Sequence, residues 1–598
     1  MKKIYIAFFL SFTAFSFSGC LDFDEPTDDF QETDIKLPDV VYQGKADSID
    51  YLKEYSMEQV KNAVNKLKKE RTLEQLNFAQ YGLLGHKNGE WSSEAHEYQR
   101  QFALTEMLAQ YGVMPHYDYA FGSEIKSAYA VSRSWLEGPN GHFLDQVKKG
   151  LTGILNHPTS DTIPEFKATG LLLYDFMAAY NTDLYGPFPY QDFKNNKQGS
   201  SFTYDATSSI YKTIVANIDT IVKVYKHYEQ RPKEYQKFIQ RQINGFTVVN
   251  PNRSKLKGFD TWRRFANSLK LRLAMHIVKV EPQLAKQWAE EAVKDGVIES
   301  HDQEFGAYPN NYSGANPILK LYDWGDMRLS ASFESMLKSL NHPYAHNLYL
   351  PNQDKFVDAD GNVTLKQESA VVGLRAGLRV GKGQGAESNP YLLYSKLNAE
   401  FVGKAPIYLI KLAEVQFLRA EGALRGWNMG GSAEYFYRNG VINSGILDYN
   451  TDKGKELQAK LEKYYELDQA VDFTYIDPLG NVSPSPSVTK IGVKWNEGDS
   501  KEMKLEKIIT QKYIALFPNS FEAWTEMRRT GYPKVFPVLN VSDGDGSLNE
   551  GDLIRRLLFP NTDDASLKDI KRTGIPALGG PDRQGTRLWW DVKDVPNI

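Results

Sequence analysis

The sequence predicts a mostly α-helical protein in which paired helices form a scaffold and long irregular loops extend from it. Apolar residues recur every three or four positions over many segments, and the alternation of strands and helices that builds a parallel sheet is missing. Turn signals between apolar residues at 360–363 and 479–482 add a few short β-hairpins. With 598 residues, 41% of them hydrophobic, the chain is long enough to bury a large core.

The N-terminus has the pattern of a lipoprotein signal peptide. Lys2 and Lys3 precede an apolar run at 4–17, which is shorter than the roughly 20 residues that a membrane span needs. Small residues then lead directly to Cys20, the single cysteine of the chain. This junction resembles a bacterial lipobox, so we expect residues 1–19 to be removed and Cys20 to be lipidated. The alternative is an ordinary secretory signal with a coincidental cysteine.

Acidic residues follow Cys20 directly and continue through residue 34. They resemble the export signal that sends lipoproteins of Bacteroides-like bacteria to the outer face of the outer membrane. A charged, proline-containing segment also makes a solvated tether, and both interpretations hold together. We therefore divide the chain into a signal peptide at 1–19, an acidic lipidated tether at 20–45 and a single helical domain at 46–598.

Amphipathic stripes place the helices of this domain. In the segment 262–277, Trp262, Phe265, Leu269 and Leu273 share one face, and the charged side chains between them, including Arg272, are expected to point away from it. The segments 409–424 and 432–444 follow each other closely and predict a helical hairpin of the size of a tetratricopeptide unit. Further helices are expected at 49–69, 165–182, 208–227, 282–294 and 505–528.

Long polar loops rich in Gly, Pro and aromatic residues lie between the helices, and the chain has 35 Tyr and 10 Trp. Sugars offer an apolar face and a rim of hydroxyls, so a sugar site needs flat aromatic rings beside polar side chains. Loop aromatics of this kind predict a glycan site. Its candidate residues are Trp91, Tyr117, Tyr308, Asn311, Tyr312, Asp323 and Trp324. The alternative for each ring is a buried anchor that holds its loop on the core.

One Asp-rich turn suggests a structural calcium ion, and no other cofactor is expected. Oxygen ligands occupy alternate positions at Asp543, Asp545, Ser547 and Asn549, as in a calcium-binding loop. The later positions of the loop pattern are not matched, because 548 is Leu where a glycine is required and 554 is Ile where a glutamate is required.

Motifs for catalysis and for nucleic-acid binding are not found. The run HEYQR at 96–100 lacks the second histidine of a zinc protease, and the glycine-rich run at 373–385 lacks the residues of a phosphate loop. Counting cannot exclude a pair of glycosidase carboxylates, but a helical fold disfavours it. The net charge of −4 includes no basic excess that could neutralise a nucleic acid. We expect a protein that is not an enzyme and has no nucleic-acid partner.

Several motifs resemble the SusD/RagB family of nutrient-binding outer-membrane lipoproteins. They are DLYGPFPY at 183–190, WRRFANSLKLRLA at 262–274, AEVQFLRAEGALRGW at 413–427, QKY at 511–513 with FEAW at 521–524 and RRTGYP at 528–533, and RRL at 555–557. They occur in the family's order, and with the lipobox they cover nearly the whole chain. The sequence departs from the family pattern at Gly422, at 342–344 and in an insert at 543–552.

The resemblance implies a scaffold of four tetratricopeptide-like helix pairs that sits as a lid over a SusC-like TonB-dependent transporter in the outer membrane. Such a protein captures an oligosaccharide, a polysaccharide or a peptide at the cell surface and delivers it without making or breaking a bond. The helix motifs themselves are expected to be scaffold or transporter contact. The alternative is a structural or adhesive surface lipoprotein that binds peptides or another protein, because Tyr-rich surfaces also suit protein interfaces.

Overall fold

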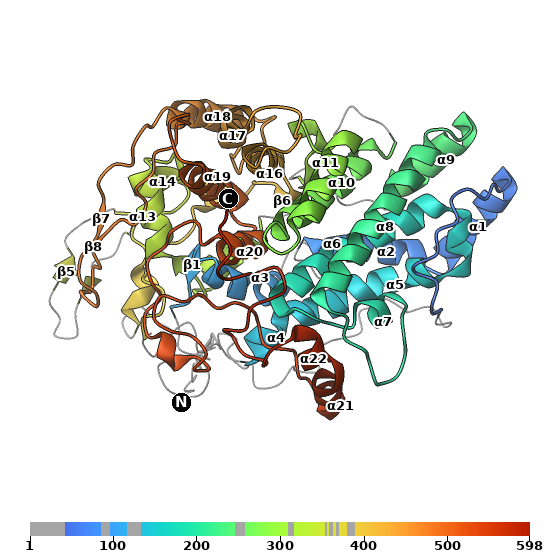
Figure 1. Ribbon diagram of the computed structural model, residues 1–598, viewed down its shortest axis with the longest axis horizontal. Helices are drawn as coiled ribbons and strands as arrows, with labels where there is room; N and C mark the ends of the chain where they lie inside the picture. The colour runs from blue at the N-terminus through green and yellow to red at the C-terminus, as the bar shows by residue number, and fades with distance from the viewer. Residues whose placement is uncertain are drawn as a thin grey trace, which may run out of the picture. The chain divides into compact units, whose positions relative to one another are not determined.

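A computed structural model of the chain describes residues 42–84, 96–115, 133–244, 258–308, 316–352, 356–357, 363–365, 370–379 and 389–598. The described residues belong to one compact unit that spans 36–598. Helices dominate this unit, as the sequence predicts (Figure 1). None of the helices in the described ranges combines the length and the apolarity that a bilayer crossing requires.

The described segment before the first helix packs on the domain. Ala46 is fully buried, and the backbone N–H groups of Gly44 and Lys45 donate to Asn195 and Asn156. The first helix begins at Met57 instead of 49, because Ser56 and Gln59 form a capping box. The first helices in the chain are α1 (Met57–Lys69), α2 (Thr72–Leu83), α3 (His96–Leu108), α4 (Arg133–His142), η2 (Phe143–Lys148), α5 (Lys149–Asn156) and η3 (Pro158–Thr162).

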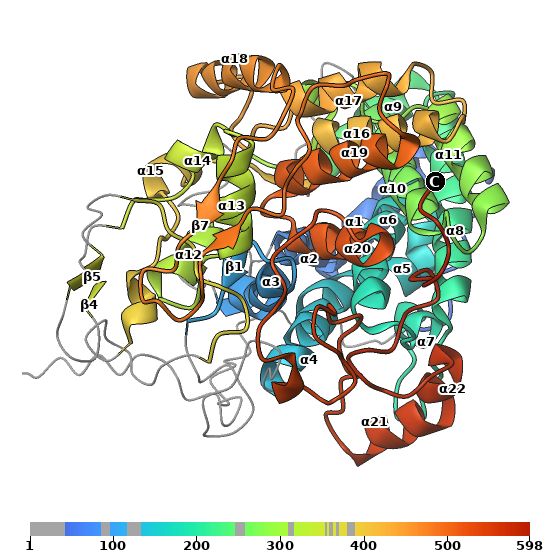
Figure 2. The same ribbon diagram turned by 60° about the vertical axis from the view of Figure 1, so that its left-hand side comes forward.

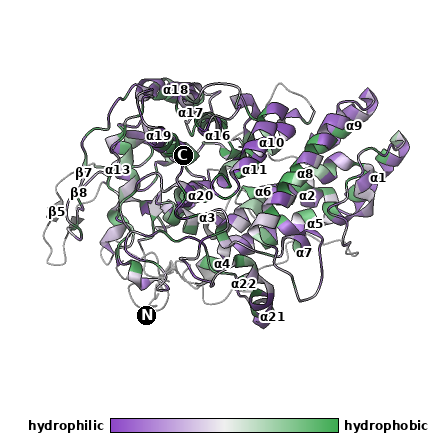
Figure 3. Ribbon diagram, viewed as in Figure 1, coloured by the Kyte–Doolittle hydropathy of each residue, from purple (hydrophilic) through white to green (hydrophobic). Residues whose placement is uncertain are grey.

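The central helix α6 (Pro164–Tyr185) is buried along its whole length and packs on α5 and on α8 (Thr207–Tyr228). It extends three residues beyond the predicted helix at 165–182. Most residues of the exposed helix α9 (Lys233–Asn244) are hydrophilic (Figure 3), and the helix buries only a narrow stripe. A short helix, α7 (Tyr190–Lys194), lies between α6 and α8 in the sequence.

The remaining scaffold consists of helix pairs. Helix α10 (Asp260–His276) packs on α11 (Pro282–Asp295), and α16 (Leu412–Leu424) packs on α17 (Ala433–Ile442), which confirms the predicted hairpin. The predicted helix at 505–528 is two helices, α19 (Lys501–Leu516) and α20 (Ser520–Thr530). The division follows from Pro518, which disfavours the helical conformation at Phe517. Figure 2 shows α16, α19 and α20 one below another, and contacts link α16 with α19 and α19 with α20.

The remaining helices of the described chain are mostly short. They are η5 (His301–Gln303), α12 (Ile318–Asp323), α13 (Ala331–Ser339), α14 (Tyr344–Asn347), η7 (Pro390–Leu393), α15 (Ala399–Val402), α18 (Asp452–Tyr465), η8 (Val541–Asp543), α21 (Asp564–Asp569), η9 (Ile570–Gly574) and α22 (Ile575–Leu578).

The strands are short and pair in antiparallel twos. The pairs are β1 (Gly112–Val113) with β3 (Arg328–Leu329), β2 (Phe305–Ala307) with β6 (Ile407–Ile410), β4 (Phe356–Val357) with β5 (Val363–Leu365), and β7 (Thr474–Tyr475) with β8 (Ser485–Pro486). The last two are the predicted hairpins. Strand β6 takes residues 407–410, so α16 begins later than the periodicity predicts.

Candidate functional site

The candidate glycan residues fall into two groups. Trp91, Tyr117, Asn311 and Tyr312 lie outside the described residues, as does the lipidation site Cys20, and these assignments remain predictions. The structure describes Tyr308, Asp323 and Trp324 and shows the surroundings of each side chain.

Tyr308 follows β2 and is only 3% exposed. Its ring lies edge-on to that of Tyr408, with the centroids 6.0 Å apart, and its hydroxyl donates to the Glu304 carbonyl at 3.4 Å. This burial favours the anchor alternative for Tyr308.

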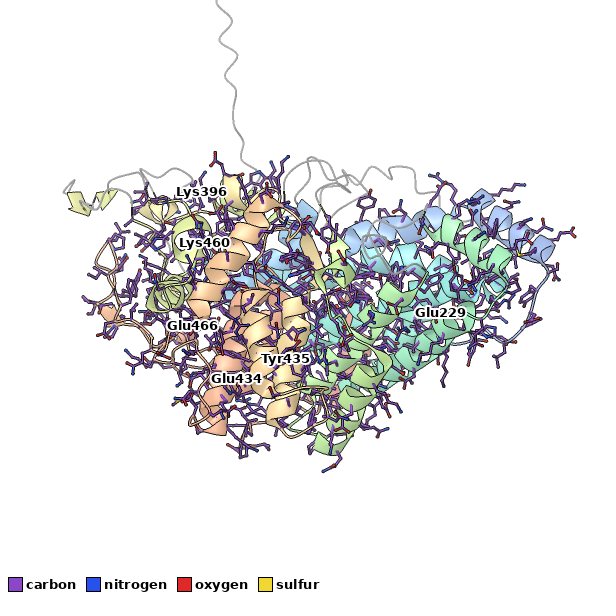
Figure 4. All side chains as sticks on the ribbon, turned by 90° about the horizontal axis from the view of Figure 1, so that it is seen from above. Glu229, Lys396, Glu434, Tyr435, Lys460 and Glu466 are labelled. Carbon is purple, nitrogen blue, oxygen red and sulfur yellow. The ribbon has the colours of Figure 1, made fainter. Side chains whose placement is uncertain are left out.

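Trp324 and Asp323 lie at the C-terminal end of α12, and both are exposed. Trp324 is 41% exposed, which places it among the few large hydrophobic side chains that the described surface exposes. The Asp323 carboxylate lies 3.8 Å from the ammonium of Lys396, a surface residue that Figure 4 labels. An exposed indole beside a carboxylate and an ammonium is an arrangement that can stack on a sugar ring and bind its hydroxyls.

A cavity lies where two of the candidate loops join the described chain. The cavity volume is about 40 Å³. Leu83 and Asn316 both line it, and the segments with Trp91 and Tyr312 lie next to them in the sequence. The rest of the lining comes from α3, α6, β6, the start of α16 and the α19–α20 link: Gln101, Phe102, Tyr180, Ile407, Tyr408, Leu409, Lys411, Glu414, Leu516, Phe517, Pro518 and Asn519.

The charged groups in the cavity wall already have partners. The Lys411 ammonium donates to the carbonyls of Ser444, Gly445 and Ala515 at 2.8–3.2 Å, and burial lowers its pKa to about 8. The Glu414 carboxylate accepts two hydrogen bonds from Arg272, at 2.6 and 2.9 Å. The described part of the cavity wall therefore presents only charges that already have a protein partner.

Two neutral polar groups in the same wall keep unused hydrogen-bonding capacity. Gln101 is 1% exposed, and its amide oxygen has no hydrogen-bond partner among the described residues. An unsatisfied buried acceptor costs about 1–3 kcal/mol. The Tyr180 hydroxyl accepts hydrogen bonds from Arg272 at 3.0 Å and from Asn519 at 2.9 Å, and neither bond uses its own proton. The sequence analysis missed both residues, because each lies within a helical pattern that is typical of core.

The sequence motifs meet in the interior as a network of buried charges, and this corrects the expectation that Arg272 points to solvent. Arg272 is 2% exposed and binds Glu414 across α10 and α16. Arg529 of α20 binds Glu421 at 2.7 Å and Glu526 at 2.6 Å, and Lys512 of α19 binds Glu522 at 3.0 Å. Charged side chains so deeply buried need partners, and this pairing fixes how the helices pack.

His276 joins this network to α6. Its ring lies 3.2 Å from the Glu522 carboxylate and 3.5 Å from that of Asp183. Burial alone lowers the pKa of His276, but the two carboxylates outweigh burial and raise it to about 9, so the imidazole is protonated at neutral pH. Asp183, from the motif at 183–190, also accepts from the Tyr211 hydroxyl at 2.5 Å and from the Trp590 indole at 2.9 Å.

His276, Glu522 and Glu526 place ligand atoms within 4.8 Å of one another, the spacing of a metal site. The ammonium of Lys512 lies 3.0 Å from Glu522 and 3.5 Å from Glu526, however, and supplies the positive charge there. The cluster is therefore part of the scaffold.

Protein groups also use the carboxylates of the predicted calcium loop. Asp543 accepts two hydrogen bonds from Arg379, at 3.0 and 3.2 Å. Asp545 accepts from the backbone of Ser547 at 3.0 Å and from that of Gln584 at 2.7 Å. Asn549 lies in the turn that Asp552 closes. A calcium ion would have to share or displace these donors, and the assignment remains a prediction.

Comparisons with known proteins agree on one family. A family model described as SusD-like, Susd and RagB outer membrane lipoprotein, matches residues 56–591. A solved chitin-binding SusD homolog from Flavobacterium johnsoniae is 29% identical, with a TM-score of 0.72 over 88% of this chain and 100% of that one. SusD homologs from Bacteroides vulgatus and Bacteroides thetaiotaomicron are 26% and 27% identical, each with a TM-score of 0.69. These matches cover 89% and 87% of this chain and 99% of theirs. The search of the curated proteins gives no match.

Proposed function

The chain belongs to the SusD-like family of outer membrane lipoproteins, and we propose that it binds oligo- or polysaccharides at the cell surface and delivers them to a SusC-like TonB-dependent transporter. In this proposal Cys20 carries the lipid, residues 20–45 are the tether and the helical domain faces the exterior. The protein makes and breaks no bond in its ligand.

The observation that carries the proposal is the match to the chitin-binding homolog, which extends over 88% of the chain at 29% identity. The exposed Trp324 supports a glycan ligand, because an indole face can stack on the apolar face of a sugar. Asp323 and Lys396 next to it supply hydrogen-bonding groups for hydroxyls.

A non-catalytic role fits the state of the buried carboxylates where the sequence motifs meet. The Glu522 carboxylate is held by Lys512 and His276, and Glu421 is held by Arg529 and Arg425. A general acid or base must exchange its proton with a ligand. These carboxylates are paired and buried, so a ligand cannot reach them. Their role in the proposal is to hold the helices that present the binding loops.

Delivery requires contact with the transporter, and the helix pairs offer surfaces for it. Tyr435 on α17 is 60% exposed, and Figure 4 labels it together with Glu434 and with Lys460 of α18. Tyrosine is enriched at protein interfaces, so this exposed ring is a candidate contact.

The test uses the lipidated full chain, purified in a detergent without a sugar headgroup and applied to a glycan array. We expect binding to at least one class of glycan, and reduced binding by Trp324→Ala with an unchanged melting temperature. Extraction from the native membrane should also recover a β-barrel transporter together with the protein. Binding to peptides and to no glycan would refute the proposed ligand class, and recovery of the protein alone in several mild detergents would refute the proposed partner.

A further inference from the structure

We propose that a basic face formed by α1 and α9 rests on the anionic lipid headgroups of the membrane that carries the lipid anchor. The face consists of Lys61, Lys68 and Lys69 on α1 and of Lys237 and Arg241 on α9. The inference uses the lipid at Cys20 from the proposed function, but it depends neither on the ligand nor on the transporter. It follows from the geometry of the face, its charge and the position of α1 in the chain.

Contacts between the two helices define the face. The Lys61 ammonium lies 4.0 Å from the Glu234 carboxylate, and the Lys68 ammonium donates to the Gln242 amide oxygen at 2.6 Å. The partners on α9 advance by eight positions while those on α1 advance by seven, so the helices run side by side in the same direction. Figure 1 shows both helices at the same end of the domain.

Helical periodicity adds the basic residues of α9 to this face. Lys237 and Arg241 follow Glu234 at three and seven positions, so they share the side of α9 that reaches α1. All five basic side chains of the face are exposed. Other sides of the two helices are buried in apolar stripes, which hold both helices on the domain: Val60, Ala63, Val64 and Leu67 on α1, and Tyr235, Ile239 and Ile243 on α9.

The charge of these helices is opposite in sign to that of the whole chain, which carries −4. The exposed charged residues of α1 and α9 are seven basic side chains and two acidic ones, Glu58 and Glu234, which gives +5. The exposed helix α18 differs, because its four lysines accompany three acidic residues and Lys460 pairs with Glu456 at 2.7 Å. A mixture like that of α18 is typical of a solvated surface. The excess on α1 and α9 instead matches an anionic partner.

The position of α1 in the chain selects lipid headgroups as this partner. The described chain begins at Tyr42, 22 positions after Cys20, and a chain of that length spans at most about 75 Å. Asn196 donates to the Tyr42 carbonyl at 3.1 Å, and α1 is the first helix that follows. A lipid at Cys20 therefore keeps the basic face close to the bilayer, where even a weak attraction is effective. Basic residues beside a membrane anchor bind anionic headgroups, and each adds about fivefold to the affinity.

The experiment measures how fast an uncharged amine-reactive ester acetylates individual lysines of the lipidated full chain. The protein is inserted into preformed vesicles of phosphatidylcholine, alone or with about 30 mol% phosphatidylglycerol, and mass spectrometry gives the rate for each lysine. At about 50 mM salt we expect Lys61, Lys69 and Lys237 to react about threefold more slowly on the anionic vesicles. The difference should disappear at about 500 mM salt, where the Debye length is about 4 Å. Lys453 and Lys455 of α18 should react equally on both kinds of vesicle.

A variant separates the basic face from the lipid anchor. The triple variant Lys69→Gln, Lys237→Gln and Arg241→Gln removes three positive charges that form no ion pair within the described chain. Lys61 of this variant should react at the same rate on both kinds of vesicle, and the melting temperature should not change. The matched control should keep the slow reaction of Lys61 on anionic vesicles. It replaces by glutamine three exposed lysines of α18: Lys453, Lys455 and Lys463.

Equal rates on both kinds of vesicle at low salt would overturn the inference and leave the proposed glycan binding intact. So would a difference that persists at high salt, or a slow reaction of Lys61 on anionic vesicles in the triple variant. Slow reaction of these lysines with soluble polygalacturonate, without an effect of anionic vesicles, would assign the face to an acidic polysaccharide instead. A chain that does not float with phosphatidylcholine vesicles would overturn the lipid anchor and, with it, this inference.

Discussion

Replacing Arg529 by methionine tests whether the buried charges hold the scaffold together. Arg529 is fully buried, and its guanidinium donates four hydrogen bonds of 2.6–3.0 Å to the carboxylates of Glu421 and Glu526. Methionine has a similar length but no charge, so both carboxylates lose their main partner. Glu421 keeps Arg425 at 2.7 Å, and Glu526 keeps Lys512 at 3.5 Å.

Removing one member of a buried ion pair costs about 3–5 kcal/mol, because the remaining charge stays buried without compensation. The remaining cations reduce this cost, so we expect Arg529→Met to lower the free energy of unfolding by about 3 kcal/mol at pH 7. The matched control is Arg572→Met, since Arg572 pairs with Asp569 at 2.8 Å but is half exposed. Its loss should cost less than about 1 kcal/mol.

The pH dependence of the same variant gives a second readout. Burial alone raises the pKa of Glu421, but Arg529 and Arg425 outweigh it and hold the pKa well below its usual range. A carboxylate with a lowered pKa contributes stability above its unfolded pKa, near 4.5, and loses it as the pH falls through the folded value. The difference between wild type and variant should therefore shrink below about pH 4.5. Urea unfolding followed by tryptophan fluorescence measures both effects, and a cost under about 1 kcal/mol at pH 7 would refute the reasoning.

Three further predictions address the anchor, the site and the scaffold. Cys20→Ala should leave the protein in the soluble fraction without incorporated palmitate, whereas a wild type that is itself soluble would contradict lipidation. Trp324→Ala should lose about 1–3 kcal/mol of glycan-binding free energy with an unchanged melting temperature. Tyr308→Ala should instead lose about 3–5 kcal/mol of stability, because its ring is buried. Calorimetry and thermal melts that show the reverse would reject these assignments. His276 has a folded pKa of about 9, above its unfolded value near 6.5. Its contribution to the free energy of unfolding, about 3 kcal/mol, is therefore complete below pH 6.5 and is lost as the pH rises through 9. A His276→Asn variant whose stability has the same pH profile as the wild type would contradict this.

The helices were predictable because their apolar faces repeat with the helical period. The segments for α10, α11, α16 and α17 follow from that period alone. The predicted helix boundaries were wrong where another interaction outweighed the helical periodicity. Pro518 divides the segment at 505–528, and the pairing of β6 with β2 takes the first residues expected in α16.

The interior charges could not be predicted from the same patterns. Arg272 lies off the apolar stripe of its helix, and such a position normally faces water. It is buried because Glu414, far away in the sequence, provides its partner on a neighbouring helix. The cavity could not be predicted from the sequence for the same reason. Its lining comes from segments that only the tertiary fold brings together, as shown by Gln101, Tyr180, Tyr408 and Phe517.

The ion network and the cavity share residues, and this links the scaffold to the site. Arg272 donates to both Glu414 and Tyr180, and both of these side chains line the cavity. Asn519 of the α19–α20 link also donates to the Tyr180 hydroxyl, so that oxygen is held from two helix ends. The interactions that pair these helices therefore also fix the Tyr180 side chain in the cavity wall.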